Sequence, residues 1–117
     1  MFYHDVEMAT RLFNLVTGKE WAVEQLLKVS ERVRNPERMF DFRQGLLRKN
    51  DTLPRKIFDE PPKRGPFKGE VMDRKKFEQM KDEYYELRGW DKETGIPKEE
   101  TLVALGLEDL VAESCDP

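Results

Sequence analysis

The residues best suited to polar chemistry gather between positions 43 and 55, in the run RQGLLRKNDTLPR. Guanidinium and carboxylate groups form charge-assisted hydrogen bonds, but they do not by themselves indicate a reaction. Leucines on either side of the charges supply apolar anchors, and Gly45 permits the positive φ with which a helix often ends. We therefore predict a structured loop whose charged side chains pair with one another or with a partner, namely Arg43, Arg48, Lys49, Asp51 and Arg55.

The motifs of common enzyme classes are missing from the sequence. It has no glycine-rich phosphate-binding motif, no HExxH and no cysteine pair. Nucleophilic catalysis needs a base beside the nucleophile, and the single histidine, His4, and the single cysteine, Cys115, stand near opposite ends. Carboxylates such as Glu83 and Glu86 fit an exposed helix face. The sequence therefore predicts no catalytic, cofactor-binding or metal-ligating residue.

The composition is unusually polar, with 38% charged residues against about 25% in typical proteins. Residues 31–69 hold 11 basic and 6 acidic side chains, whereas residues 70–117 hold 7 and 14. The basic block could suggest nucleic-acid binding, but neighbouring acids such as Asp41 beside Arg38, and a pI near 5.3, make it unlikely. With no apolar run of about 18 residues and no secretory signal, we expect a cytoplasmic chain without membrane contact.

Apolar periodicity predicts an all-α fold. We expect helices over 5–17, 21–34, 73–88 and 97–106, and a further helix that begins at Pro36 and ends near Gly45. Pro36 should end or kink the helix before it, because proline lacks an N–H and clashes with the preceding turn. Residues 46–72 hold four prolines and two glycines. The expectation is one small helical domain, residues 1–117, of about four to five helices with a long Pro/Gly-containing loop.

The helix over 73–88 is the most clearly marked. Phe77, Met80, Tyr84 and Leu87 recur at helical spacing and should form its buried face. This spacing places Tyr84 in the core and Tyr85 at its edge. The resulting core is small for 117 residues, so stability is expected to depend partly on a partner surface.

Spaced motifs give the sequence a resemblance to the C-terminal end of the aldehyde:ferredoxin oxidoreductase family. The resemblance covers about residues 14–111, with differences at Ser30, Pro36, Gln44 and Asn50. The residues that carry it are Arg43-x-Gly45-x-x-Arg48-x-x-Asp51-x-Leu53-Pro54, then Tyr84-Tyr85-x-x-Arg88-Gly89-Trp90-Asp91, Gly95-x-Pro97 and Leu105-Gly106-Leu107.

The resemblance implies a part of a larger redox enzyme. Whole enzymes of the family oxidise aldehydes to carboxylic acids with a tungsten (or molybdenum) pterin and pass electrons through a [4Fe–4S] cluster to ferredoxin. The groups that hold these cofactors lie upstream of the matched region. The chain is thus expected to bind no cofactor and to be inactive alone, to help close the substrate channel, and to pack against upstream domains or a subunit of the same enzyme. Its candidate interdomain docking loop is Arg43, Arg48, Asp51 and Arg55.

A stand-alone helical protein-interaction module that binds a partner through residues 31–69 is the alternative. The reading frame upstream of Met1 distinguishes the two hypotheses, because continuity with cluster cysteines supports the enzyme part. Nucleic-acid binding is a weaker third option, and it predicts an affinity that falls steeply with salt.

Overall fold

The computed structural model describes residues 5–112, and these residues are all-α, as the sequence predicts. The elements are α1 (Val6–Thr17), α2 (Val23–Arg43), the 3-10 turn η1 (Arg48–Asn50), α3 (Arg55–Asp59), α4 (Arg74–Arg88), α5 (Glu99–Ala104) and α6 (Asp109–Ala112). Within this range the only β pairing is an isolated bridge between Trp90 and Pro97. The predicted Pro/Gly-containing loop is present between α2 and α4, interrupted by η1 and α3.

Helix ends follow the capping residues of the sequence. Asp5 accepts a hydrogen bond from the backbone N–H of Met8 and starts α1, and Asp73 does the same for α4 through Lys76. Such a side-chain oxygen satisfies an N–H group that has no partner within the helix. Gly18 and Gly89 end the same two helices in the left-handed region. These four boundaries are confirmed.

The prediction that one helix ends before Pro36 and another begins there is wrong. Pro36 lies inside α2, which runs without interruption for 21 residues. A proline costs a helix one hydrogen bond, but tertiary contacts can outweigh that cost. Here Asn35, Arg38 and Met39 are all buried beside it and tie both halves of α2 to the rest of the chain. Tertiary packing therefore decides the path of the helix.

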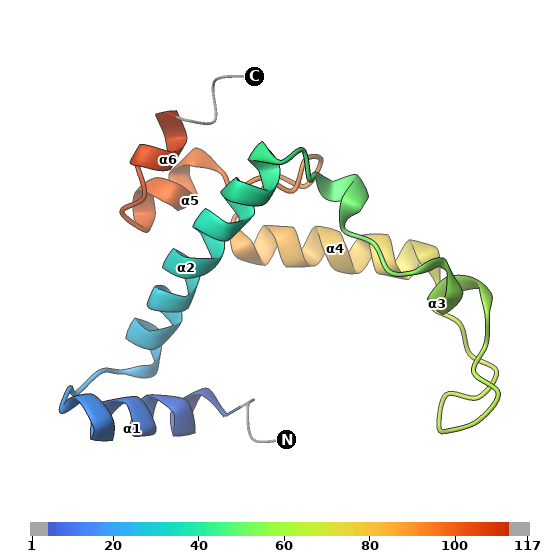
Figure 1. The fold of residues 1–117 in the computed structure, drawn as a ribbon, viewed down its shortest axis with the longest axis horizontal. Coiled ribbons are helices and arrows are strands. Elements are labelled where there is room, and N and C mark those ends of the chain that lie inside the picture. Colours follow the sequence, from blue (N-terminus) through green and yellow to red (C-terminus); the bar gives the residue numbers. More distant parts are fainter. Residues whose placement is uncertain (1–4, 113–117) are drawn as a thin grey trace.

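The helices form an open arch rather than a ball. The radius of gyration is 18.1 Å, whereas a compact domain of about 100 residues has one of about 13 Å. In Figure 1, α1 and α2 make one arm and α4 with the loop beyond α3 makes the other. The arms meet where the C-terminal end of α4 reaches α2, with α5 and α6 close by. No helix among the described residues is long and apolar enough to cross a membrane.

The buried core is correspondingly small and divided. One part lies where the arms meet, and it includes Met39, Tyr85, Trp90 and Leu102. The other is the contact of α3 with α4, where the rings of Phe58 and Phe77 meet nearly edge to face at 5.4 Å. Most other large apolar side chains are exposed, so the fold leaves much apolar surface uncovered.

Candidate functional site

A cluster of polar and aromatic side chains joins the two arms, and we name it the arginine joint. It consists of Arg38 on α2, Arg48 and Asp51 in the η1 segment, and Tyr85 and Trp90 at the end of α4. Arg38 is buried, and its two terminal nitrogens donate to the two carboxylate oxygens of Asp51 at 3.0 and 2.5 Å. This bidentate geometry is the strongest pairing that a guanidinium makes with a carboxylate.

Two aromatic side chains complete the surroundings of this ion pair. The hydroxyl of Tyr85 donates to the Asp51 carboxylate, and the Arg38 guanidinium lies over the Trp90 ring, 5.2 Å from its centre. The indole N–H of Trp90 donates to the side-chain oxygen of Asn35 at 2.8 Å. Among the described residues no buried side-chain nitrogen or oxygen lacks a partner. The joint is thus a satisfied polar network, which fixes one geometry.

The protonation of Asp51 and Tyr85 follows from these contacts. Partial burial opposes the charged form of Asp51, but hydrogen bonds from Arg38 and Tyr85 outweigh it, and the net pKa of Asp51 is lowered. Burial and then the hydrogen bond to Asp51 raise the pKa of the Tyr85 phenol. The joint therefore holds an ionised carboxylate and a neutral phenol at neutral pH.

Arg48 fastens the η1 segment to the other arm. Its backbone N–H donates to the carbonyl oxygen of Thr94 at 2.8 Å. Its side chain pairs with Asp82 and with Glu78, at 2.7 Å for the latter, and donates to the carbonyl oxygen of Lys92 at 2.6 Å. One arginine thereby connects the loop to α4 and to the turn that follows Trp90.

That turn approaches Arg38 so closely that it requires glycine. Gly95 has φ +76°, and its carbonyl oxygen accepts from Nε of Arg38 at 2.8 Å. A Cβ on Gly95 would lie 2.5 Å from a terminal nitrogen of Arg38 and 3.2 Å from the Tyr85 ring and hydroxyl. Both the backbone conformation and the space exclude a side chain here.

The structure brings together two of the four predicted docking residues. Arg48 and Asp51 lie in the arginine joint, whereas Arg43 and Arg55 are exposed outside it. The side chain of Arg55 is 92% exposed and lies 3.8 Å from Asp59. The docking function of the four residues stays a prediction.

Sequence reasoning missed the central residue and misplaced a tyrosine. Arg38 pairs with Asp51, 13 residues away, and not with its sequence neighbour Asp41. Tyr85 is buried and Tyr84 is exposed, the reverse of the prediction. A useful indication was available for Arg38, since it shares a helix face with Asn35 and lies next to the apolar Met39. A lone arginine in such a position is expected to have a buried partner.

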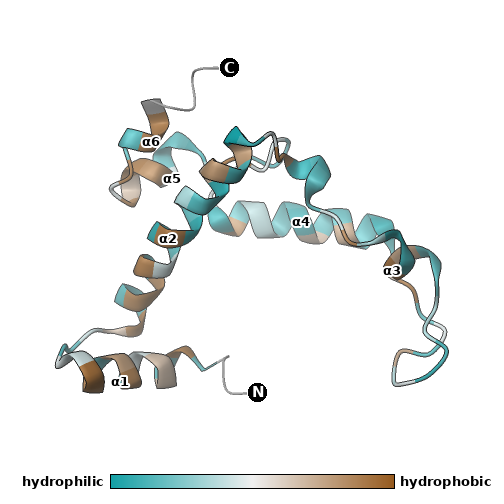
Figure 2. Ribbon diagram, viewed as in Figure 1, coloured by the Kyte–Doolittle hydropathy of each residue, from teal (hydrophilic) through white to brown (hydrophobic). Residues whose placement is uncertain are grey.

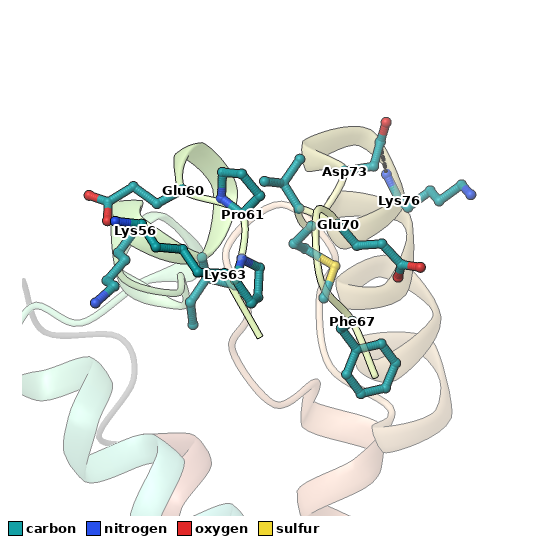
Figure 3. A pocket seen from close by; sticks show the side chains of 12 residues that line it. Lys56, Glu60, Pro61, Lys63, Phe67, Glu70, Asp73 and Lys76 are labelled. Atoms are coloured by element: carbon teal, nitrogen blue, oxygen red, sulfur yellow. Dashed lines mark hydrogen bonds between the residues drawn. The ribbon is translucent and has the colours of Figure 1, made fainter. Parts of the chain in front are cut away.

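A second feature is an open cleft of about 1070 Å³ between α3, the loop after it and the start of α4. Its apolar walls include Ile57, Phe67, Val71 and Met72. Figure 3 shows Lys56 and Glu60 on one side of the cleft and Asp73 and Lys76 on the other, with Phe67 at its lower edge. Lysines and carboxylates balance around it, so the cleft favours no sign of charge.

The described residues present no metal centre. Between residues 5 and 112, no three His, Cys, Asp or Glu side chains gather as ligands for a metal ion. His4 and Cys115 lie outside the described residues. The arginine joint therefore holds the two arms and the η1 segment in fixed positions relative to one another.

Comparison with known proteins gives consistent matches. The family model "Aldehyde ferredoxin oxidoreductase, domains 2 & 3" matches residues 2–107. The tungsten-containing aldehyde ferredoxin oxidoreductase of Pyrococcus abyssi is 41% identical over 101 residues, which are 86% of this chain and 16% of that protein. The corresponding enzyme of Pyrococcus horikoshii is 40% identical over 103 residues, or 87% and 16%. The chain thus spans about one sixth of the length of these relatives.

A solved structure agrees with the sequence matches. The active site complex BamBC of benzoyl coenzyme A reductase, solved with 1,5-dienoyl-CoA, superposes with a TM-score of 0.69 at 27% identity. The match covers 92% of this chain and 15% of that one. The arch therefore occurs as a small part of a much larger polypeptide.

Proposed function

Because this chain belongs to the aldehyde ferredoxin oxidoreductase family, we propose that it works as a helical part of an enzyme that oxidises aldehydes to carboxylic acids. Residues 1–117 would act as one helical unit that packs against the rest of that enzyme and closes one side of its substrate channel. Electrons would leave the whole enzyme to ferredoxin, and the enzyme would be cytoplasmic.

The observation that carries this proposal is the uncovered apolar surface of the arch. Leu15 and Val16 on α1 are 79% and 86% exposed, and Leu87 on α4 is 88% exposed. Figure 2 shows apolar turns along α1 and α2 that no other helix overlaps in that view. Large exposed apolar side chains gathered in this number are typical of an interface, and the matched relatives have about five times as much chain outside this region.

The chemistry is assigned to other parts of the enzyme. The relatives in Pyrococcus contain tungsten, and a pterin and a [4Fe–4S] cluster belong to the same proposal. A cluster of that kind needs four thiolates, and the described residues offer no cysteine and no group of metal ligands. We therefore assign these residues no step of the reaction.

In this proposal, contacts within the chain hold the docking loop in a fixed position. Arg48 and Asp51 hold the η1 segment against α4 and the turn at residues 91–96. Arg43 at the end of α2 and Arg55 on α3 are exposed, and in this proposal they face another domain of the enzyme. Arg48→Ala or Asp51→Ala in the whole enzyme should lower its melting temperature or its metal content. Unchanged values for both variants would contradict the docking role.

An exchange of segments tests the function. This chain would replace the matched region of the P. abyssi enzyme, and the chimera would be compared with the same enzyme lacking that region. We expect the chimera to be soluble, to contain tungsten and to oxidise aldehydes, and the shortened enzyme to lose these properties. The 117-residue chain alone should be colourless and inactive. A shortened enzyme with full tungsten content and activity, or a tungsten-bearing preparation of the chain alone, would overturn the proposal.

The likeness to BamBC favours a second candidate substrate. That structure belongs to a benzoyl coenzyme A reductase and is 27% identical over nearly the whole chain. The whole enzyme could therefore act on an aromatic coenzyme A thioester in place of an aldehyde. Assays of the whole enzyme with an aromatic aldehyde and with benzoyl coenzyme A would separate the two, and the higher identity to the Pyrococcus enzymes favours the aldehyde.

A further inference from the structure

Helix α2 has two opposite faces that carry different kinds of side chain. Glu31, Asn35, Arg38 and Phe42, at spacings of 4, 3 and 4, face the chain's own core. Of these, Glu31 pairs with Arg88, Asn35 accepts from Trp90, and Arg38 forms the arginine joint. These polar contacts of α2 all lie on the inner face, and the buried Met39 lies beside it.

The other face carries an apolar stripe, which we name the outer stripe: Leu26, Val29, Val33, Pro36 and Phe40. At 3.6 residues per turn these positions lie opposite the inner face. Val33 is 56% and Phe40 61% exposed, and the stripe contains no charged residue. It extends over 15 residues, from Leu26 to Phe40, or about 21 Å of helix. Leu26 and Pro36 are half-buried, whereas Val29, Val33 and Phe40 are exposed, so the chain itself leaves much of the stripe uncovered.

The spacing of the outer stripe identifies the kind of surface that covers it. Its members recur at intervals of 3, 4, 3 and 4 residues, which is the heptad pattern of a helix that packs lengthwise on another helix at about 20°. On the basis of the proposed function, we infer that an apolar α-helix from the remaining part of the enzyme lies along the outer stripe. The chain outside the matched region, about 84% of the P. abyssi relative, provides that helix.

Such packing would make α2 the central helix of a larger bundle, with the arginine joint on one side and the partner helix on the other. It also gives a reason for Pro36 within the helix. A proline on the outer stripe presents its ring to the partner, while Asn35 and Arg38 on the inner face keep the helix continuous.

Photo-cross-linking in the chimera of the P. abyssi enzyme tests this inference. Benzoylphenylalanine replaces Val33 or Phe40 on the outer stripe, and Lys28, an exposed residue of α2 away from the stripe, in the matched control. We expect positions 33 and 40 to cross-link to one helical segment outside the matched region, at sites about seven residues apart. Position 28 should give no such product.

Other products would overturn the inference. The inference is contradicted by cross-links to a second copy of the matched region or to a loop or strand. It is also contradicted if neither stripe position gives a cross-link. Benzoylphenylalanine in place of Leu87 on α4 separates this failure from failure of the proposed function. Products from position 87 without products from 33 and 40 overturn the inference alone, and no product from any of the three overturns both.

A measurement on the 117-residue chain keeps the inference testable if the chimera does not fold. Val33→Asp should preserve the helical circular dichroism as well as Lys28→Asp does, because the outer stripe is not needed by the chain's own core. Met39→Asp, which charges a buried position on the same helix, should abolish it. If Val33→Asp unfolds the chain as Met39→Asp does, the stripe belongs to the chain's own core and the inference is wrong.

Discussion

The arginine joint and the outer surfaces of the arms differ in how their side chains are satisfied. In the joint, Arg38, Asp51, Tyr85 and Trp90 find all their partners within the chain. On the arms, large apolar side chains such as Leu15 and Leu87 have almost no cover. The joint is held by contacts within the chain, whereas we propose that the arms are covered by the rest of the enzyme.

This contrast indicates what kind of stability each region contributes. A buried ion pair is specific in geometry but adds little net stability compared with an apolar replacement. Apolar burial supplies the main driving force of folding. An arch held by a polar joint and short of apolar burial is expected to be marginally stable alone and to gain stability when it is assembled.

The largest predicted effect comes from Arg38→Met, which removes the charge at the centre of the joint. Asp51 would lose both guanidinium contacts and the carbonyl of Gly95 its donor. Removing one partner of a buried pair costs about 3–5 kcal/mol, which urea unfolding of the 117-residue chain measures. Arg34→Met is the control, since the Arg34–Glu37 pair is exposed and worth about 0–1 kcal/mol. Equal losses for both variants would show that the joint is not central.

The next effect concerns the close approach of the turn. Gly95→Ala forces a non-glycine residue to φ +76° and places a Cβ 2.5 Å from Arg38, for an expected loss of about 2–4 kcal/mol. Gly65→Ala is the matched control, because Gly65 also has a positive φ, +95°, but open space around it. It should cost about 1–2 kcal/mol. Thermal unfolding of both variants separates crowding in the joint from backbone strain alone.

A smaller effect depends on pH. The pKa of Asp51 is lowered in the folded chain from its ordinary 3.8, after the contacts with Arg38 and Tyr85 outweigh burial. Such a group stabilises the fold above the unfolded pKa, and this contribution is lost as the pH falls through the folded pKa. Asp51→Asn should therefore be less stable than the parent at pH 7, with a difference that shrinks below about pH 4. If the stability difference between Asp51→Asn and the parent stays constant between pH 7 and pH 3, the ion pair does not stabilise the fold.

The smallest effect in the isolated chain is expected on the arms. Leu15→Ser alters a side chain that is already mostly exposed, so the free energy of unfolding should change by no more than about 0.5 kcal/mol. In the assembled enzyme the same substitution removes apolar burial and should lower the melting temperature. The comparison of the two melting curves sharpens the contrast between joint and arms.

The sequence predicts the local features of this fold better than its long-range ones. Caps at Asp5 and Asp73 and the stops at Gly18 and Gly89 follow from backbone chemistry within a few residues. Arg38 finds Asp51 across 13 residues and Gly95 across 57, and no local pattern encodes such a meeting.

Periodicity was misleading on α4 for a related reason. Met80, Tyr84 and Leu87 recur at helical spacing yet are exposed, while the inner face uses Phe77 and Tyr85. An apolar stripe shows that a face will be covered, but it does not show by what. Because this chain spans only about a sixth of the length of its relatives, such a stripe can belong to an interface with the rest of the enzyme.

Hydroxyl-radical footprinting tests the central claim most directly, because it measures the solvent exposure of individual side chains. Leu15, Val16 and Leu87 would be compared in the free 117-residue chain and in the chimera with the P. abyssi enzyme. The account predicts rapid oxidation of all three in the free chain and at least tenfold slower oxidation in the chimera. Equal oxidation in both would show that the arms stay bare in the enzyme and would contradict the account.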